Sequence, residues 1–395
     1  MDNRNNLLIF ILALGVFGIL NTELGVVGIL PLIAEHFHVS ISQAGLLVSL
    51  FALALAVAVA ISGPILPLLF SVINRKKVML LVLGGFVIGN IVSIFATNFT
   101  TLLIARVIPA FLHPVYISIA LTVASTSVSK EEVRKAVSKV ILGVSAGMVL
   151  GVPIATFIAN QTSLKMAMIF FTVVNLIVFI ATLLFVPSMP VTEKRSYGSQ
   201  LSVLKKWVTW LAILAVVCLN AARNGVYSYF AVYLQNVTNV SAKTLTVMLV
   251  LFGAATIYGN MVAGKILSKT AMKSVVYYPF VFGALYLLLF FMGSFTGPMF
   301  IIVLVWGVLF ALGTNGSQYW ITSAAPEAPE LANGLFLAFG NLGITIGTSV
   351  SGLFISGMGT QYVVFSGLLF LILSLGFILI RNYMYSPVKR AGQNF

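Results

Sequence analysis

Long apolar runs separated by short polar segments dominate the sequence. Each run has about the 20 residues that an α-helix needs to cross a bilayer. The sequence lacks the ten-residue alternation of apolar and polar positions that a membrane β-barrel requires. The pattern therefore predicts an all-α membrane protein with twelve transmembrane helices. These lie near residues 7–30, 44–69, 78–97, 99–126, 136–160, 165–187, 207–235, 243–267, 274–294, 298–322, 331–356 and 360–384.

The basic residues predict how the chain is oriented. With the N-terminus inside, only Lys165 and Lys243 fall in outer loops, and only Arg106 and Arg223 fall inside spans. The other 18 of the 22 Lys and Arg residues then lie on the cytoplasmic side. Because Lys and Arg concentrate in cytoplasmic loops, this bias predicts a multi-pass protein of the cell membrane with both termini cytoplasmic.

The chain also divides into two similar halves. A polar, basic linker over 188–206 separates an N-terminal six-helix half, 1–187, from a C-terminal six-helix half, 207–395. A shift of 196 residues aligns glycines, a lysine and a glutamate of one half with those of the other. The halves are therefore predicted to be pseudo-symmetric, as in many secondary transporters. The aligned pairs are Gly63 with Gly259, Lys77 with Lys273, Glu131 with Glu327, Gly147 with Gly343, and Gly151 with Gly347.

Composition excludes several classes of protein. The chain is 60% hydrophobic and 8% charged, against roughly 25% charged residues in soluble domains. The net charge of +14 reflects topology and contact with the lipid bilayer, so no nucleic-acid partner is expected. Cys218 is the single cysteine, which excludes an intrachain disulfide. The sequence contains no phosphate-binding loop, metal-ligand cluster or nucleophile–base pair. We therefore expect neither a cofactor nor an enzyme.

Four segments carry a resemblance to a known family. They are NTELGVVGILPLIAEHF, SGPILPLLFSVINRKKVML, LLIARVIPAFLHP and GVSAGMVLGVP. The chain resembles the major facilitator superfamily, in particular the bacterial twelve-span drug:proton antiporters with the sugar-efflux and purine-efflux permeases. The resemblance implies alternating access, a monomer, and export of a drug, sugar or purine-type solute. It also implies a gating loop at Gly63, Arg75, Lys76 and Lys77, although Asn74 stands where the family has an acid.

Small residues recur at every fourth position in the fifth span. Such a strip lets a second helix approach closely. We expect the strip to serve as the smooth contact that two moving halves need, with a related strip in the eleventh span. The residues of this packing motif are Gly143, Gly147, Gly151, Pro153, Gly343 and Gly347.

Glu23 is the one acidic residue inside a span, and an ionisable group there is by default a functional candidate. Arg106 is predicted to lie at the same depth, about 10 Å from the outer surface at 1.5 Å per residue, and the resemblance would bring the two together. His113 follows two turns later, beside Pro109 and Pro114, which bend the helix and free carbonyls. We predict proton coupling at Glu23, Arg106 and His113. The alternatives are a fixed Glu23–Arg106 pair and a neutral, hydrogen-bonded His113.

Asn220, Arg223, Asn224 and Tyr227 form one polar face on an apolar helix, because their spacing is i, i+3, i+4, i+7. A stripe of this kind is predicted to line a cavity that suits an anionic or carbonyl-bearing substrate; the alternative is an interhelical hydrogen-bond ladder. The predicted substrate-binding residues are Asn21, Arg106, His113, Tyr116, Asn220, Arg223, Asn224, Tyr227, Trp306, Phe310 and Gln318.

These features predict proton-coupled secondary efflux of a small organic molecule. Two alternatives stay open, namely an uncoupled facilitator of the same solutes and a ligand-binding membrane protein that does not transport.

Overall fold

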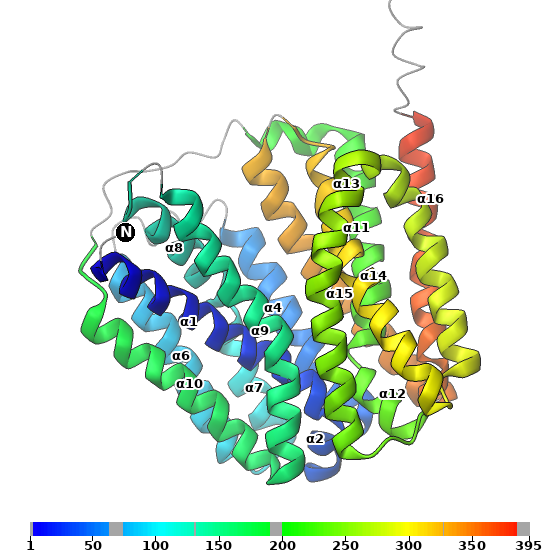
Figure 1. Cartoon of the computed structure of the whole chain (residues 1–395), viewed down its shortest axis with the longest axis horizontal. Coiled ribbons are helices and arrows are strands. Elements are labelled where there is room, and N and C mark those ends of the chain that lie inside the picture. Colours follow the sequence, from blue (N-terminus) through cyan, green and yellow to red (C-terminus); the bar gives the residue numbers. More distant parts are fainter. Residues whose placement is uncertain (1–2, 63–73, 130–131, 190–199, 327, 385–395) are drawn as a thin grey trace, which may run out of the picture. The chain divides into compact units, whose positions relative to one another are not determined.

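The computed structural model describes residues 3–62, 74–129, 132–189, 200–326 and 328–384, and the regular structure in these ranges is entirely helical (Figure 1). The chain divides into two compact units. One comprises Met1–Arg195 with Ser241–Gly253, and the other Ser196–Val240 with Ala254–Phe395. The observed fold is therefore the predicted all-α arrangement of long apolar helices.

The helices of the first unit cover the first six predicted spans. They are α1 (Asn3–Gly25), the 3₁₀ turn η1 (Val26–Ile29), α2 (Leu30–His36), α3 (Ile41–Ala44), α4 (Leu46–Ser62), α6 (Arg75–Ile94), α7 (Phe99–Ala110), α8 (His113–Thr126), α9 (Val133–Gln161) and α10 (Leu164–Phe185).

The second unit is built mainly from the remaining helices. They are η2 (Gln200–Lys205), α11 (Trp207–Tyr227), α12 (Phe230–Asn236), α13 (Ala242–Met292), α14 (Thr296–Thr322), α15 (Pro329–Met358), η3 (Thr360–Tyr362) and α16 (Val363–Met384). The first turns of α13, up to Gly253, belong to the first unit.

Helix α13 contains two of the predicted spans. It runs for 51 residues, and Thr270 in its middle has non-helical backbone angles of φ −139° and ψ 33°. At 1.5 Å per residue, so long a helix would exceed any bilayer's apolar core of about 30 Å. Figure 1 shows the chain turning over near the α13 label. With α13 divided at Thr270, the eleven apolar helices found in the described residues correspond to the twelve predicted spans.

Three spans are interrupted rather than continuous. The 3₁₀ turn at Val26–Ile29 separates α1 from α2, Phe111 and Leu112 separate α7 from α8, and Ser228 and Tyr229 separate α11 from α12. Pro109 in the last turn of α7 and Pro114 at the start of α8 explain the second break, because proline removes a backbone donor and clashes with the preceding turn.

Glycines bring two pairs of helices into close contact. In the first unit, a Cβ added at Gly147 of α9 would lie 2.7 Å from Leu20 Cβ of α1. In the second unit, a Cβ at Gly347 of α15 would lie 2.6 Å from Ala221 Cα of α11. Each glycine strip thus packs on the first helix of its own unit. The proposed role of the strips in motion between the halves stays a prediction.

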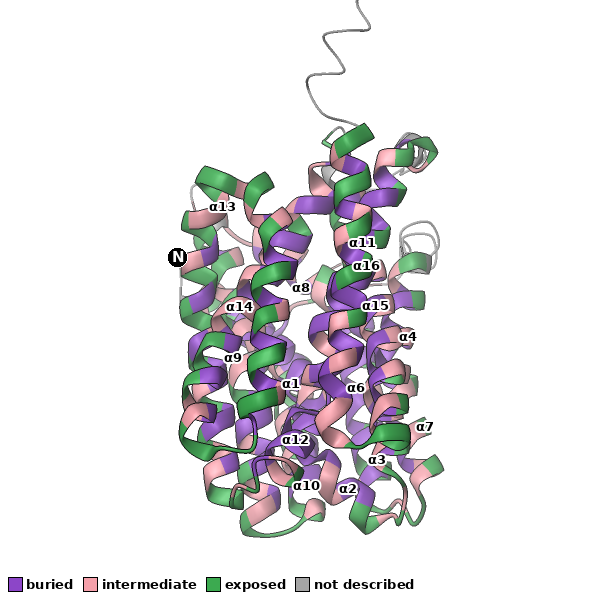
Figure 2. Ribbon diagram, turned by 90° about the vertical axis from the view of Figure 1, so that its right-hand side faces the viewer, coloured by how far each residue is buried: buried purple, intermediate pink, exposed green. Residues whose placement is uncertain are grey.

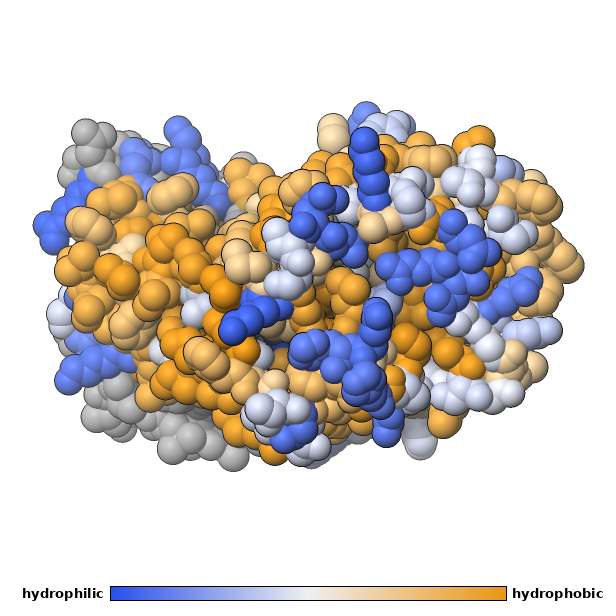
Figure 3. All heavy atoms as spheres, turned by 90° about the horizontal axis from the view of Figure 1, so that it is seen from below, coloured by the Kyte–Doolittle hydropathy of each residue, from blue (hydrophilic) through white to orange (hydrophobic). Residues whose placement is uncertain are grey.

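The surface of the molecule is apolar where a soluble protein would be polar. Figure 2 shows buried and exposed residues following one another along the helices, so each long helix has an inward and an outward face. Large apolar side chains on the outward faces include Ile88, Leu142 and Ile372, which are 64%, 66% and 69% exposed. Figure 3, seen from below, shows hydrophilic side chains scattered among apolar ones on that face. Such a surface requires lipid around it.

Candidate functional site

Three ionisable residues inside the spans lie beside helix breaks. Glu23 is two residues before the end of α1, His113 is the first residue of α8, and Arg223 lies in the last turns of α11. Interrupted helices are typical of ion and substrate sites in transporters, because a break exposes backbone groups to a buried ligand. These three positions therefore define two candidate sites, one in each unit.

In the first unit, Glu23 faces His113. Glu23 Oε2 lies 3.2 Å from His113 Nδ1, within ion-pair distance, and the two side chains are 16% and 5% exposed. The alignment of these atoms is not that of a hydrogen bond. Among the described residues, Glu23 Oε2 and both ring nitrogens of His113 have no hydrogen-bond partner. The pair thus brings a half-buried carboxyl group and a buried imidazole together at short range.

Arg106 lies next to this pair but binds other atoms. Its Nη2 donates to the backbone carbonyl of Thr22, its Nη1 lies 3.8 Å from Met168 Sδ, and its guanidinium lies 5.4 Å from the centre of the Phe171 ring. The expected contact between Arg106 and Glu23 is not found among the contacts of the described residues. Arg106 thus binds the backbone one residue before Glu23 and not the Glu23 carboxylate.

Thr22 is the centre of a buried hydrogen-bond network. Asn175 Nδ2 in α10 donates to Thr22 Oγ1 at 2.8 Å and to the Gly18 carbonyl at 3.2 Å. Asn90 Nδ2 in α6 lies 3.3 Å from the same hydroxyl. Asn90 and Asn175 are absent from the predicted site residues, although an amide within an apolar span is a signal that could have identified them. The network holds α1, α6, α7 and α10 together around the Glu23–His113 pair.

Asn21 and Tyr116 are both buried in the first unit. The side-chain oxygen and nitrogen of Asn21 have no hydrogen-bond partner among the described residues. Asn21 packs against Gly151 of α9, and the hydroxyl of Tyr116 lies against Gly15 of α1. Tyr116 therefore meets α1 about two turns before Glu23, whereas Asn21 faces α9. Their predicted role in substrate binding stays a prediction.

Arg223 is the centre of the second site. It is 1% exposed. Its Nη1 donates to the Phe310 carbonyl at 2.9 Å and to Thr314 Oγ1, and its Nη2 donates to Asn220 Oδ1 at 2.7 Å. Asn224 Nδ2 donates to the Asn220 carbonyl at 3.2 Å. The predicted polar face of α11 is thus assembled against α14 within the second unit.

Aromatic rings surround the Arg223 guanidinium. The guanidinium lies 5.0 Å from the centre of the Phe310 ring, which itself lies 5.2 Å from the ring of Tyr227. The rings of Phe230 and Trp306 are 4.8 Å apart and pack edge to face. The structure therefore brings together the predicted residues Asn220, Arg223, Asn224, Tyr227, Trp306 and Phe310.

Gln318 does not belong to this cluster. Its Nε2 donates to Asn333 Oδ1 of α15 at 3.1 Å, and the residue is exposed. In the same helix, Asn315 Nδ2 donates a hydrogen bond to Asn260 Oδ1 of α13 at 2.8 Å. Gln318 therefore joins α14 to α15 in this conformation, whereas the face of α14 that carries Phe310 and Thr314 contacts Arg223.

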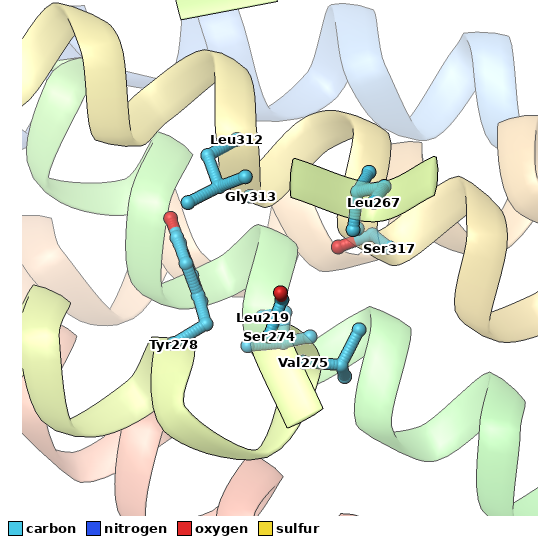
Figure 4. A pocket seen from close by; sticks show the side chains of 9 residues that line it. Leu219, Leu267, Ser274, Val275, Tyr278, Leu312, Gly313 and Ser317 are labelled. Atoms are coloured by element: carbon cyan, nitrogen blue, oxygen red, sulfur yellow. The ribbon is translucent and has the colours of Figure 1, made fainter. Parts of the chain in front are cut away.

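A small cavity is lined by Gly313 and Tyr278 of the second unit (Figure 4). Arg223 is near it, because a Cβ added at Gly313 would lie 2.8 Å from Arg223 Cδ. Its volume is about 10 Å³, and the hydroxyl groups of Tyr278 and Ser317 have no hydrogen-bond partner among the described residues. Space of this size holds about one water molecule, so it is too small for an organic substrate. The cavity is lined by Leu219 of α11, by Leu267, Ser274, Val275 and Tyr278 of α13, and by Leu312, Gly313, Gly316 and Ser317 of α14.

The predicted gating loop is described only in part. Gly63 lies outside the described residues. Asn74 caps α6 by accepting from the Lys76 amide at 3.0 Å, and Lys76 Nζ donates to the Leu183 carbonyl at 2.9 Å. The Arg75 amide donates to the Met189 carbonyl at 3.0 Å. This basic segment, which continues with Lys77, thus joins the start of α6 to the end of α10.

A bundle of apolar helices, with buried charges beside breaks in three spans, defines a multi-pass membrane transporter. The sequence profile of the Major Facilitator Superfamily matches residues 7–330. The chain belongs to this superfamily, and it is a transporter rather than an enzyme.

Proteins of similar sequence bear out this assignment. The chain is 31% identical over 379 residues to the uncharacterized MFS-type transporter YtbD of Bacillus subtilis (strain 168), with 92% of this chain and 93% of YtbD covered. It is 27% identical over 353 residues to the inner membrane transport protein YdhP of Escherichia coli (strain K12), with 89% and 90% covered.

Solved structures show the same fold. A bacterial homologue of the human lysosomal transporter Spinster, inward-facing and unoccupied, matches with a TM-score of 0.77 at 16% identity, covering 98% of this chain and all of that one. A mutant of the nucleoside transporter NupG matches with a TM-score of 0.78 at 14% identity, covering 97% of this chain and all of that one.

Proposed function

We propose that the protein is a proton-coupled exporter of a small organic solute that works by alternating access, as a monomer with both termini in the cytoplasm. Glu23 and His113 are its proton-binding pair in this proposal. The supporting observation is that the half-buried Glu23 and the buried His113 face each other at 3.2 Å. The positions of both, beside helix breaks, allow their exposure to change when the spans move.

The electrostatics of the pair explain how protonation would control the transport cycle. With one proton the pair has no net charge, whether the proton is on the carboxyl or on the imidazole. When that proton leaves, Glu23 keeps a negative charge that the neutral His113 no longer balances, which is costly away from water. The deprotonated state therefore favours a conformation that admits water or a cation to Glu23.

In the proposed cycle, the pair takes up a proton from the more acidic exterior and releases it to the cytoplasm. Release accompanies loading of the solute on the cytoplasmic side. Arg106 would act as a positioning residue, because it holds the Thr22 carbonyl beside Glu23.

Proton binding can be measured before the solute is known. A pH jump applied to reconstituted protein on a solid-supported membrane should give a transient current, because protons enter a buried site. Glu23→Gln should abolish this current and His113→Gln should strongly reduce it. The matched controls are Glu35→Gln and His36→Gln, which make the same changes at exposed positions on α2, and both should keep the current. A full-sized current in Glu23→Gln would contradict the assignment of the proton site.

Coupling is then tested by transport. A thermal-shift panel of nucleobases, nucleosides, sugars, organic acids and antibiotics selects a solute, and proteoliposomes with an imposed pH gradient show whether it accumulates. Uphill accumulation that Glu23→Gln abolishes would support coupled export. Exchange of labelled for unlabelled solute without accumulation would indicate an uncoupled facilitator instead, and binding without any flux would indicate a protein that does not transport.

A further inference from the structure

We infer that the second unit binds an organic anion with an aromatic ring, and that Arg223 pairs with its carboxylate. This inference rests on the proposed export of a small organic solute and specifies the chemical class of that solute. It begins from a charge that the protein itself does not neutralise.

Arg223 is a buried cation with neutral partners. Its guanidinium donates to the Phe310 carbonyl, the Thr314 hydroxyl and the Asn220 side-chain oxygen. Among the described residues, none of the contacts of Arg223 is with an acidic side chain, and the ion pair between Glu23 and His113 lies in the first unit. The charge of Arg223 therefore has no acidic partner in the described part of the chain.

Among the described residues of the second unit, Glu330 is the only acid. Of the eight acidic residues of the whole sequence, only Glu327 and Glu330 belong to this unit, and Glu327 lies outside the described residues. Glu330 is the second residue of α15, whereas a Cβ at Gly340 of the same helix would lie 3.7 Å from Asn220 Nδ2. The ten residues from Glu330 to Gly340 correspond to about 15 Å along the axis of α15. The backbone at position 330 is therefore well removed along α15 from the level of Asn220, which binds Arg223.

An unpaired guanidinium in the membrane interior is costly, and such residues are typically kept for function. Arginine binds carboxylates through two parallel hydrogen bonds, which are stronger than bonds to neutral acceptors. A carboxylate that replaces the Thr314 hydroxyl on Nη1 would supply the missing negative charge. The arrangement thus favours an anionic ligand over a neutral one.

The surroundings of Arg223 add the second chemical requirement. Tyr227, Phe310, Asn224 and Thr314 are partly exposed, whereas Arg223 lies behind them. The Tyr227 and Phe310 rings are tilted by 51° with their centres 5.2 Å apart. Aromatic faces of this kind pack well on a planar ring. The neighbouring cavity holds about one water molecule, so the ring of the ligand would bind over Tyr227 and Phe310.

Matched pairs of carboxylates and amides can isolate the contribution of charge. We would measure the binding of benzoate against benzamide and of phenylacetate against phenylacetamide to the full chain in lipid nanodiscs at neutral pH. Thermal stabilisation and quenching of tryptophan fluorescence serve as readouts. Each carboxylate should bind about ten- to a hundredfold more tightly than its amide, the range expected for hydrogen bonds to a charged group.

Variants at Arg223 test which residue provides this preference. Arg223→Gln should remove the preference for carboxylate over amide, while Arg223→Lys should keep part of it, because lysine retains the charge without the paired donors. The control Lys243→Gln removes an exposed positive charge at the start of α13 and should leave the ratio unchanged. Size-exclusion profiles and melting temperatures show that each variant is folded.

Several outcomes would overturn the inference. They are equal binding of carboxylate and amide, no binding of either carboxylate, and a preference that survives in Arg223→Gln. The ratio of carboxylate affinity to amide affinity distinguishes charge pairing from a structural role of Arg223. A general loss of packing would weaken the binding of both ligands alike and leave this ratio unchanged. Since these are binding measurements, they do not depend on the pH-jump result at Glu23, and either proposal can fail without the other.

Discussion

The packing of α15 on α11 gives a prediction that compares two glycines in one helix. Gly347 faces the backbone of α11, where an added Cβ would lie 2.6 Å from Ala221 Cα and 2.7 Å from its carbonyl carbon. Gly334, in the same helix, has nothing within 4 Å of an added Cβ. Gly347→Ala and Gly334→Ala are therefore the same chemical change in a crowded and in an open position.

The structure sets the sign and size of each effect. Replacing glycine by alanine within a helix stabilises it by about 0.5–1 kcal/mol, because alanine loses less backbone entropy on folding. Gly334→Ala should show this gain. At Gly347 the new methyl meets backbone, which cannot rotate away, and overpacking costs about 1–3 kcal/mol. Gly347→Ala should therefore be less stable than Gly334→Ala by about 1–3 kcal/mol.

Thermal unfolding of the purified variants in one lipid composition provides the measurement. In a unit of this size each kcal/mol corresponds to about 2–4 °C in melting temperature, so the two variants should differ by several degrees. Gly357→Ala, at a third position of α15 with nothing within 4 Å, is a second control. A Gly347→Ala variant that melts with or above Gly334→Ala would refute the close approach of α15 to α11.

Two further predictions concern buried hydrogen bonds. Asn175→Ala removes the amide that donates to Thr22 Oγ1 and the Gly18 carbonyl, so it should lower the free energy of unfolding by about 1–3 kcal/mol. The control Asn160→Ala removes an amide nitrogen without a hydrogen-bond partner among the described residues and should lower the free energy of unfolding by less. Equal losses of stability in the two variants would contradict the network. Arg381→Gln removes donors to the Trp320 carbonyl at 2.8 Å and to Ser323 Oγ at 2.9 Å and should lower the melting temperature by several degrees, whereas the exposed control Lys269→Gln should leave it within about 1 °C.

The fold could be predicted from the sequence because one strong physical rule determines it. Hydrocarbon cannot satisfy backbone polar groups, so a long apolar run must form a helix. The runs and their polar breaks therefore gave the spans directly, and the family resemblance gave the superfamily. Even the double span of α13 follows from the break between 267 and 274, where the structure has Thr270 out of helical geometry.

The partner of Glu23 could not be predicted in the same way. Matching the depths of Glu23 and Arg106 assumes two regular helices and says nothing about the direction in which each side chain points. In the structure, Arg106 binds the backbone at Thr22, while the break before α8 places His113 beside Glu23. The prolines at 109 and 114 predicted that the helix would bend, but sequence spacing cannot give the direction of the bend.

The glycine strips show a similar division between what spacing predicts and what it leaves open. Small residues at every fourth position predict a close helix contact, and Gly147 and Gly347 each meet another helix at short range. The spacing does not identify the partner, because any helix with a compatible surface could occupy the strip. The partners, α1 and α11, follow only from the packing of each unit.

The two proposals together fix how much charge would move in each transport cycle. One proton that enters while one organic monoanion leaves amounts to two positive charges carried inward. A charge that crosses the membrane is worth about 2.3 kcal/mol per 100 mV, so an inside-negative potential would contribute about 4.6 kcal/mol per 100 mV, in addition to the pH gradient. With a neutral solute, only one charge would move inward in each cycle, so the membrane potential would contribute half as much free energy. Under the two proposals, a buried arginine in one unit, with no acidic partner among the described residues, and a proton-binding pair in the other unit would thus give the membrane potential a direct role in driving export.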